Sequence, residues 1–399
     1  MMTTKNDTAR ARRAVALRTI SVGLILLAVL WVLYGDTLST RLLSWLPGLS
    51  QKSLRVLFVG DTSFGENYHD KKFFESRGYD FFLKELDPLL YQSDLVIANL
   101  ETPLTNLDRS FLAGKKRFIH WGDVQKTPKT LHDHNIRFVS LANNHTLDYG
   151  TVGLLQTLKA LNKNDIAWFG AGVDELEASK PLRRSFTLED YPFELVVVSG
   201  FAYSPRYDSA FHCYAKGDVG GVKMWTMRKA ANQLLRIRQA DNHAFIVAFP
   251  HWGQDCQFKA EGQTKLAHTL IDAGADLVIG HGSHMFQEIE QYRGRWIIYS
   301  LGNFAFNFPG SCQKFNVHPF SLTASLEVTR QEESLVLALK LYPILSDNLI
   351  CHYQPRLVTS EELSRIKDIL IGRSLEPAFL EKHVRTGEDK VGLFLALGI

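Results

Sequence analysis

From about residue 54 onward, the chain repeats one pattern: a short apolar run, a polar cluster, and then a stretch with helical periodicity. Helical patterns are centred near 80–90, 151–163, 225–240 and 263–273, and Gly274 follows the last of them as a C-cap signal. Such alternation is typical of an α/β fold in which helices cover the sheets. The apolar runs that predict strands are 55–59, 95–98, 138–142, 194–198, 244–250, 277–280 and 296–301.

Two strand-like runs, 322–328 and 335–341, follow each other with no helical pattern between them. They predict an antiparallel hairpin, which we expect to close a second sheet. Beyond this hairpin the pattern turns helical, and Ser360 is expected to cap a helix. We therefore predict one large domain over 54–345 and a C-terminal helical appendage over 346–399.

The amino-terminal residues form a different kind of segment. Residues 1–13 are basic, and residues 14–34 are long enough to cross a bilayer if Arg18 extends toward the headgroups. Positive charge before the apolar run predicts a cytoplasmic amino terminus and an extracytoplasmic body. A cleaved signal peptide is the alternative, but the apolar run is followed by no small-x-small cleavage site. We expect a single-pass membrane protein with a signal anchor at 14–34 and a juxtamembrane linker at 35–53.

Composition narrows the function classes. A chain of 399 residues with 45% hydrophobic content can bury a large core. Lys and Arg together number 45 against 42 for Asp and Glu, and a net charge of +3 argues against a nucleic-acid partner. The four cysteines form no C-x-x-C pair, which argues against a cysteine zinc site. Outside the cytoplasm a disulfide can form. The sequence does not assign which cysteines would pair, and four free thiols are the alternative.

Polar residues of one chemical kind follow the predicted strands. After the run at 138–142 come Asn144 and His145, which places an amide and an imidazole at the carboxyl edge of a sheet. Taken alone, such a sequence also makes an ordinary strand-to-helix turn with a polar cap. Six ligand-type residues at strand ends are hard to explain as caps, and they are Asp61, Glu101, Asn144, His251, His281 and His284. This inventory of carboxylates, an amide and imidazoles suits a hydrolytic centre with one or two divalent ions such as Mn, Fe, Zn or Mg.

At these residues the chain resembles the calcineurin-like metallophosphoesterase superfamily and, within it, the CapA family of bacterial capsule (poly-γ-glutamate) synthesis proteins. The resemblance covers about residues 54–342 and implies a four-layer α/β/β/α sandwich. It also implies a surface role with an anionic polymer such as poly-γ-glutamate and with other capsule synthesis membrane proteins. The motifs that carry it are Gly60-Asp61, Asn99-Leu100-Glu101-Thr102-Pro103, Ala142-Asn143-Asn144-His145, Asp148-Tyr149-Gly150, His251-Trp252-Gly253, Gly280-His281 through His284, and Ser300-Leu301-Gly302-Asn303-Phe304.

The resemblance also implies roles for individual residues. Glu101 would bridge two metals, and Asn144, His251 and one of His281 and His284 would complete the second site. Asp61 and the other histidine would belong to the first site, and His145 would give a proton to the leaving group. Residues of the same motifs expected to contact substrate are Asn143, Asp148, Trp252 and Asn303.

Two departures from the superfamily pattern bear on the first site. Its Asp-x-His is Asp61-Thr62-Ser63 here, so an imidazole is missing, and its Gly-His-x-His is one residue longer. Glu66 or His69 could substitute for the missing ligand. Two function hypotheses follow: a metal-dependent hydrolase acting on phosphoesters or on the polymer's amide bonds, and a non-catalytic polymer-binding subunit of a capsule synthesis or export complex.

Overall fold

The structure is a computed structural model, which describes residues 52–308 and 312–398. The chain divides into the units Met1–Gln51 and Lys52–Ile399, and only the second is described below. The expected basic segment 1–13, the signal anchor 14–34 and nearly all of the linker 35–53 lie outside the described residues. Within the described part, no helix is both long enough and apolar enough to cross a membrane.

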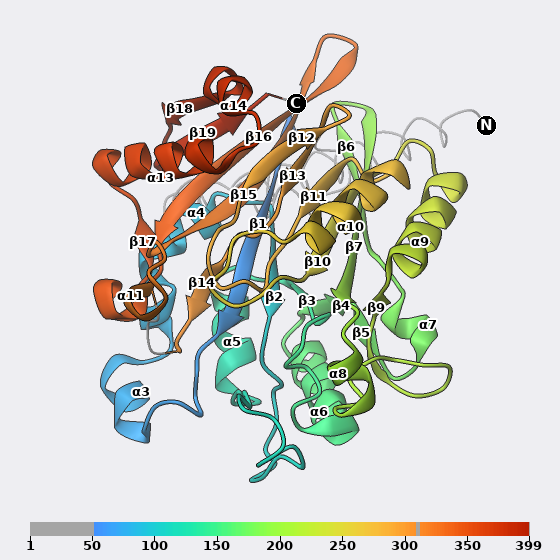
Figure 1. Ribbon diagram of the computed structural model, residues 1–399, viewed down its shortest axis with the longest axis vertical. Coiled ribbons are helices and arrows are strands. Elements are labelled where there is room, and N and C mark those ends of the chain that lie inside the picture. Colours follow the sequence, from blue (N-terminus) through green and yellow to red (C-terminus); the bar gives the residue numbers. More distant parts are fainter. Residues whose placement is uncertain (1–51, 309–311, 399) are drawn as a thin grey trace, which may run out of the picture. The chain divides into compact units, whose positions relative to one another are not determined.

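Ten strands form the larger sheet (Figure 1). Strands β1 to β4 are parallel to one another, whereas β15 pairs with β1 in the antiparallel sense. Two short strands lie off the main path, β14 (Asn303–Phe306) beside β1 and β17 (Arg356–Leu357) beside β16. The main order is β18 (Val384–Glu388), β19 (Leu393–Leu397), β16 (Ser334–Leu345), β15 (Phe320–Gln331), β1 (Ser53–Ser63), β2 (Leu95–Leu100), β3 (Phe138–Ser140) and β4 (Ala167–Phe169).

Seven strands form the second sheet, and its central strands β7, β10, β11 and β13 are parallel. Its order is β12 (Ile289–Tyr292), β13 (Arg295–Ile298), β11 (Leu277–Ile279), β10 (Phe245–His251), β7 (Tyr191–Ala202) and β6 (Leu182–Leu188), with β9 (Met224–Trp225) beside β7. A separate two-stranded sheet pairs β5 (Ala171–Gly172) with β8 (Gly221–Val222).

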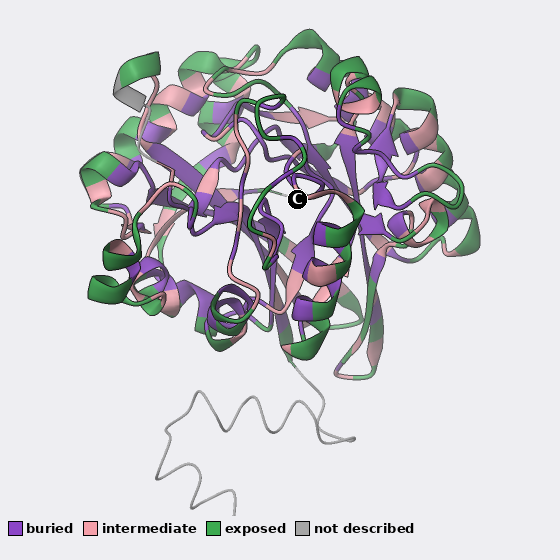
Figure 2. Cartoon of the chain, turned by 90° about the horizontal axis from the view of Figure 1, so that it is seen from below, coloured by how far each residue is buried: buried purple, intermediate pink, exposed green. Residues whose placement is uncertain are grey.

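The alternation of side chains along β1 shows how the sheets are covered. Leu54 and Phe58 belong to an apolar cluster that also contains Val197 of β7 and Phe249 of β10, so one face of each sheet packs against the other. Leu57, on the opposite face of β1, belongs to a second cluster together with residues of helices. Figure 2 shows these strands buried in the interior, with most exposed positions on the helices and loops around them.

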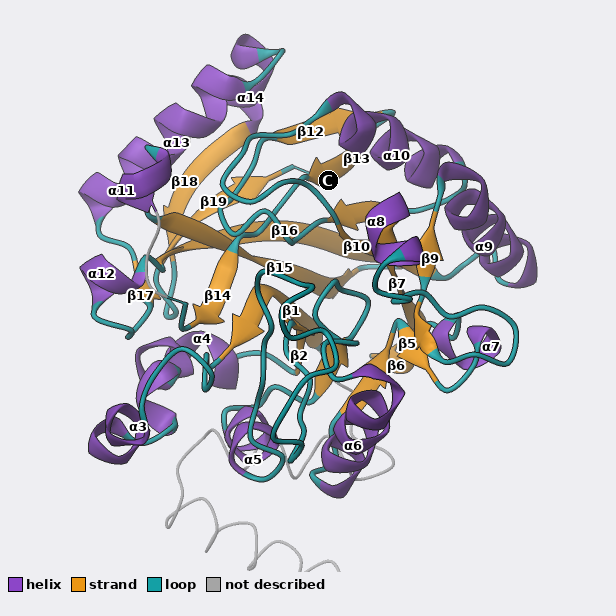
Figure 3. Ribbon diagram, turned by 60° about the horizontal axis from the view of Figure 1, so that its bottom comes forward, coloured by secondary structure: helices purple, strands orange, loops and turns teal. Residues whose placement is uncertain are grey.

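Helices lie outside the sheets (Figure 3). Apolar residues of α4 (Asp87–Tyr91), α5 (Lys126–Asp133) and α6 (Gly150–Lys163) join the second cluster, and those of α9 (Met227–Ala240) and α10 (Glu261–Asp272) cover the smaller sheet. The remaining helical segments are α3 (Lys71–Arg77), η1 (Asp80–Phe82), η2 (Lys84–Leu86), α7 (Glu175–Ala178), α8 (Pro205–Ser209), α11 (Cys312–Phe315), α12 (Asn348–Cys351), α13 (Ser360–Arg373) and α14 (Pro377–His383).

The α/β class is confirmed, and each of the seven predicted apolar runs overlaps a strand. The antiparallel hairpin is also present, as β15 and β16. Its expected place was wrong: β15 pairs with β1 from Ser53↔Thr329 onward, so the hairpin extends the first sheet instead of closing the second. The run near 80–90 forms two 3₁₀ turns and the short helix α4, where Pro88 stands in the first turn and lacks the N–H of a continuous helix.

The C-terminal segment 346–399 contains strands as well as the expected helices. Its strand β19 pairs with β16 and places Leu395 and Leu397 in the cluster between the sheets, because alternate apolar residues suit a half-buried strand. The helix α13 is capped by Thr359 and not by Ser360. The Thr359 hydroxyl accepts from the Glu362 N–H at 3.3 Å, and the Glu362 carboxylate accepts from the Thr359 N–H at 2.8 Å.

Candidate metal centre

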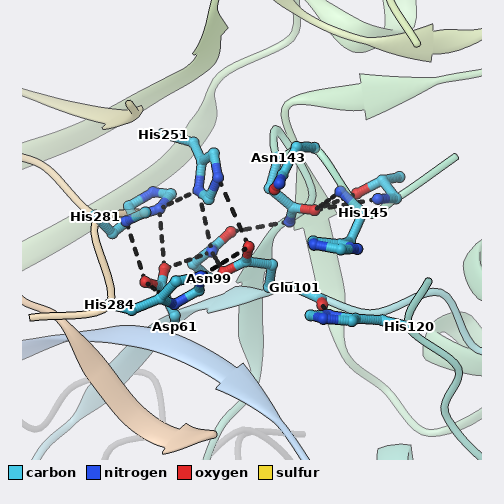
Figure 4. Close-up of polar contacts among 12 residues, drawn as sticks. Asp61, Asn99, Glu101, His120, Asn143, His145, His251, His281 and His284 are labelled. Carbon is cyan, nitrogen blue, oxygen red and sulfur yellow. Dashed lines mark hydrogen bonds and ion pairs between the residues drawn. The ribbon is translucent and has the colours of Figure 1, made fainter. Parts of the chain in front are cut away.

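The carboxyl ends of strands from both large sheets meet at one place (Figure 4). Asp61 lies within β1, and Glu101 directly follows β2. His251 is the last residue of β10, and it forms a parallel β-bridge with His281, which is separated from the end of β11 by Gly280 alone. The six ligand-type residues predicted from strand ends therefore come from two sheets.

Two close backbone approaches fix the position of Asp61. Its N–H donates to the carbonyl oxygen of Gly302 at 2.9 Å, where β1 is irregular between Val59 and Asp61. A Cβ on Gly60 would lie 1.8 Å from the same Gly302 oxygen, so the strand admits only glycine there. The close packing of Gly60 and Asp61 against Gly302 therefore fixes the backbone from which the Asp61 side chain projects.

The side chains form two groups able to hold a cation, Asp61 with His251 and His281, and Asp61 with Glu101 and His284. In each group the potential donor atoms lie within 4.8 Å of one another. Asp61 Oδ1 is 3.5 Å from His281 Nδ1, and Asp61 Oδ2 is 3.4 Å from His284 Nδ1. Asp61 is thus the residue common to both groups, whereas the bridging role of Glu101 stays a prediction.

Three buried polar atoms near this point have no hydrogen-bond partner among the described residues. They are Glu101 Oε1, Asn144 Oδ1 and His281 Nε2. Leaving a buried polar group unsatisfied costs about 1–3 kcal/mol, so each such atom in a folded protein calls for a partner. A carboxylate, an amide oxygen and an imidazole nitrogen are all metal ligands, and the donor set therefore fits a divalent cation.

Two buried carboxylates at the centre attract positive charge: burial alone would lower the pKa of His284, but the charges of Glu101 and Asp61 raise it well above its usual value. Burial raises the pKa of Glu101 well above its usual value, and the nearby charge of Asp61 raises it further. Burial would raise the pKa of Asp61 too, but the hydrogen bonds and charges of His281 and His284 hold it well below its usual value. Burial and the neighbouring His281 lower the pKa of His251, which favours the neutral imidazole that binds metals.

Beside the ligand groups, His145 lies in a buried polar cluster. Its Nδ1 is 2.6 Å from the Asp148 carboxylate, which fixes the orientation of the ring. Lys116 donates to the Asn144 carbonyl oxygen at 2.7 Å and forms a short ion pair with Asp148. The ring of His120 stacks on His145 with 3.4 Å between centroids. His145 is therefore held rigidly next to Asn144.

A cavity of about 620 Å³ opens beside the centre, and Asn144, His145, His284 and Asn303 lie in its wall. Of the four residues expected to contact substrate, only Asn303 lines it, and its amide oxygen is 2.9 Å from His284 Nδ1.

The other three expected substrate contacts are buried side chains engaged within the protein. Asn143 donates to Asn99 at 3.0 Å and accepts from the His145 N–H at 3.0 Å. The Trp252 indole donates to the Tyr299 carbonyl oxygen at 2.7 Å. Asp148 is fully buried in the His145 cluster. Their contacts position the neighbouring residues, and direct substrate contact by them stays a prediction.

Sequence reasoning missed three residues of this region. The Asn99 amide donates to Asp61 at 2.9 Å and lies 3.4 Å from Glu101 and from His251 Nδ1, so it connects the ligands. Its place in the Asn99-Leu100-Glu101 motif could have indicated it. Lys116 and His120 lie in the long loop after β2, away from any strand end, and no local signal marks them.

Neither Glu66 nor His69 belongs to the two ligand groups. Glu66 instead accepts from Asp123 N–H at 3.2 Å and from Thr127, and His69 Nε2 is 2.7 Å from the Asn307 carbonyl oxygen. Cys213 and Cys351 are free thiols, and whether the chain carries a disulfide stays open.

Comparisons with known proteins agree on one family. A family model described as "Bacterial capsule synthesis protein PGA_cap" matches residues 55–308, which include all the residues of the centre. The chain is 30% identical over 312 residues to the PGA biosynthesis protein CapA of Bacillus subtilis (strain 168), and this match covers 76% of this chain and 75% of the relative.

Two further relatives are similar over shorter or comparable lengths. The capsule biosynthesis protein CapA of Bacillus anthracis is 28% identical over 301 residues, covering 74% of this chain and 69% of the relative. A probable polyglutamine synthesis accessory protein of Mycobacterium tuberculosis (strain ATCC 25618 / H37Rv) is 33% identical over 230 residues, covering 55% and 57%.

Proposed function

We propose that this chain, which belongs to the PGA_cap family of bacterial capsule synthesis proteins, acts through a divalent metal centre on an anionic capsule polymer. Poly-γ-glutamate is the polymer class that the names of the relatives suggest. The finer fold that we propose is the metallophosphoesterase-like four-layer sandwich. It is supported by the two facing sheets with helices outside them.

One observation carries the metal proposal. Glu101 and Asn144 each present a buried oxygen, and His281 a buried ring nitrogen, without a hydrogen-bond partner in the described part of the chain, and Glu101 and His281 belong to the two ligand groups that share Asp61. Burying several unpartnered polar atoms together is costly unless a further group, such as a cation, binds them.

The first candidate activity is hydrolysis of a phosphoester or of the polymer's amide bonds. A bound divalent cation would supply Lewis-acid polarisation and lower the pKa of a coordinated water to about 7. The chain's own contribution is positioning: Asn99 orients Asp61, and Asp148 holds His145 at the cavity wall. Burial and the charge of Lys116 lower the pKa of His145 well below its usual value, so its protonated imidazole is a strong acid. From the cavity wall this protonated form would give a proton to a leaving group, a step typically worth about 10²- to 10⁴-fold.

The second candidate is a non-catalytic, polymer-binding subunit of a capsule synthesis or export complex. It is favoured by Ser63, which stands where the superfamily pattern has an imidazole, so this position supplies no imidazole ligand. Both candidates share our proposal of a single-pass anchor at residues 14–34 with the body outside the cytoplasm. Protease added to intact cells, or to spheroplasts if an outer membrane is present, should digest the body, and full protection would refute that topology.

Metal content decides between the candidates. Elemental analysis of the purified full chain should find stoichiometric divalent metal if the centre is built for hydrolysis, and none if only polymer binding remains. His145→Ala should keep the metal and lose turnover, most strongly on esters with poor leaving groups. Equal rates for variant and wild type on the poorer leaving group would remove His145 from the mechanism.

A further inference from the structure

The cavity beside the metal centre has an unusual combination of walls. Charged side chains of both signs lie around it, with the cations in excess: Lys116, Arg117, Arg206 and Lys314 against Asp255 and Asp347. Aromatic rings also line it, among them Phe306 and Phe308. The cavity volume of about 620 Å³ is in the range of small-molecule sites.

Two of the cations are guanidinium groups that are free to bind a ligand. Arg117 and Arg206 make no ion pair with any carboxylate in the described part of the chain, and both are exposed. Lys116, in contrast, is already neutralised by Asp148. Unpaired guanidinium groups at the wall of a cavity attract carboxylate or phosphate oxygens, to which they can donate two parallel hydrogen bonds.

Each of these guanidinium groups is supported by a ring. The Arg117 Cζ lies 4.8 Å from the centroid of Phe118, and the Arg206 Cζ lies 5.3 Å from that of Phe211. Stacking on a ring holds the plane of the guanidinium while leaving its N–H edges available. The two groups are thus partly preorganised for an anion.

The aromatic wall begins at the metal centre itself. The ring of Phe306 lies 4.7 Å from His284, a proposed ligand, and 5.3 Å from His120. Farther along the wall, Phe308 packs edge-to-face on Phe118 at 5.7 Å, so the rings reach the support of Arg117. A ligand made only of charged groups would gain nothing from this surface, whereas an apolar group would be removed from water.

We infer that the cavity binds an amphipathic organic anion, in which a carboxylate or phosphate that meets Arg117 and Arg206 is joined to an apolar or aromatic group that packs on Phe306 and Phe308. The inference rests on the proposed function, because it takes this cavity as the substrate site of the metal centre. It narrows the substrate class: the natural substrate carries an apolar portion next to its anionic group.

The test uses pairs of non-hydrolysable anions that differ only by a ring. Methylphosphonate and benzylphosphonate form one pair, and acetate and phenylacetate form the other, which separates phosphate-type from carboxylate-type recognition. Binding to the full chain is measured by calorimetry after the metal has been removed with a chelator. The phenyl member of at least one pair should bind about 10-fold more tightly, because its ring buries apolar surface.

Variants separate the contribution of the two arginines to binding from that of the aromatic wall. Arg117→Gln combined with Arg206→Gln should weaken both members of the pair about 10-fold or more. Phe308→Ala should weaken only the phenyl member, and Phe308→Leu serves if the alanine variant melts early. Arg293→Gln is the matched control, because Arg293 also lies over a ring, that of Tyr292, but outside this cavity.

Equal affinity for both members of both pairs, or arginine variants that bind like the control, would overturn the inference. Binding that appears only after metal is restored and ignores the arginine variants would overturn it as well, while leaving the metal proposal intact. Arginine-dependent binding in a protein that never retains metal would support the inference and refute the metal proposal.

Discussion

Replacing Lys116 by Met should destabilise the protein strongly, because this side chain is the cationic partner of a fully buried carboxylate. The side chains of Lys116 and Asp148 are 5% and 0% exposed, and they form a short ion pair. Lys116 also donates to the Asn144 carbonyl oxygen at 2.7 Å. Methionine fills a similar volume, so the change removes charge and hydrogen bonds with little change in packing.

The expected magnitude follows from the burial of the pair. Removing one partner of a buried ion pair typically costs about 3–5 kcal/mol, because the remaining charge is left uncompensated. For the unit Lys52–Ile399, an unfolding entropy of about 2.1 cal/mol/K per residue gives about 0.7 kcal/mol/K. The melting temperature of Lys116→Met should therefore fall by about 4–7 °C.

The loss should also depend on pH. Burial already raises the pKa of Asp148, and the charge of Lys116 opposes that rise. Without Lys116 the pKa of Asp148 in the folded state rises further above its unfolded value, so the folded protein retains the proton more readily. Stability gained from a raised carboxyl pKa is present at low pH and lost as pH rises through that pKa. The fall in melting temperature caused by Lys116→Met should accordingly be larger at pH 8 than at pH 5.

Scanning calorimetry at both pH values measures these shifts, with two further variants beside the first. Lys129→Met is the matched control, since its ion pair with Asp133 is 70% and 42% exposed and therefore contributes little to stability. Lys116→Met with Asp148→Asn should recover part of the loss, because no buried charge is left alone. A single variant that melts within 1 °C of wild type, or a double variant no more stable than the single one, would refute this account.

Three more predictions concern the proposed ligand His251, Gly60 in strand β1, and the buried carboxyl group of Glu66, which belongs to neither ligand group. His251→Ala should lower the metal content of the purified chain while His268→Ala, a histidine outside the ligand groups, should not; equal occupancy in both would show that the assigned site is wrong. Gly60→Ala should lower metal content and melting temperature together, because its Cβ would lie 1.8 Å from a carbonyl oxygen; an unchanged melting curve would contradict this. Burial raises the pKa of Glu66 to about 7, so wild-type stability should fall as pH rises through about 7, and Glu66→Gln should gain in melting temperature relative to wild type between pH 6 and pH 8.5; parallel pH profiles would count against it.

The sequence by itself determined the elements and the chemistry of the centre. Buried parallel strands need continuous apolar runs, so the strands around 55–59 and 244–250 were visible as such, and the class followed from their alternation with helices. The residues that directly follow those runs, such as His251, lie at the carboxyl edge of a sheet for a local reason. The ligand-type residues could therefore be found without knowing how the sheets are arranged.

Only the tertiary structure decided how these elements share surfaces. Whether the hairpin of β15 and β16 joins one sheet or the other depends on pairing across hundreds of residues, which periodicity does not encode. Periodicity also does not encode the contacts that Lys116 and His120 make with His145 from a loop. Nor does it encode that the Trp252 indole donates to a backbone carbonyl oxygen instead of lining the cavity. A local pattern fixes which edge a side chain occupies, but long-range packing fixes what that side chain faces.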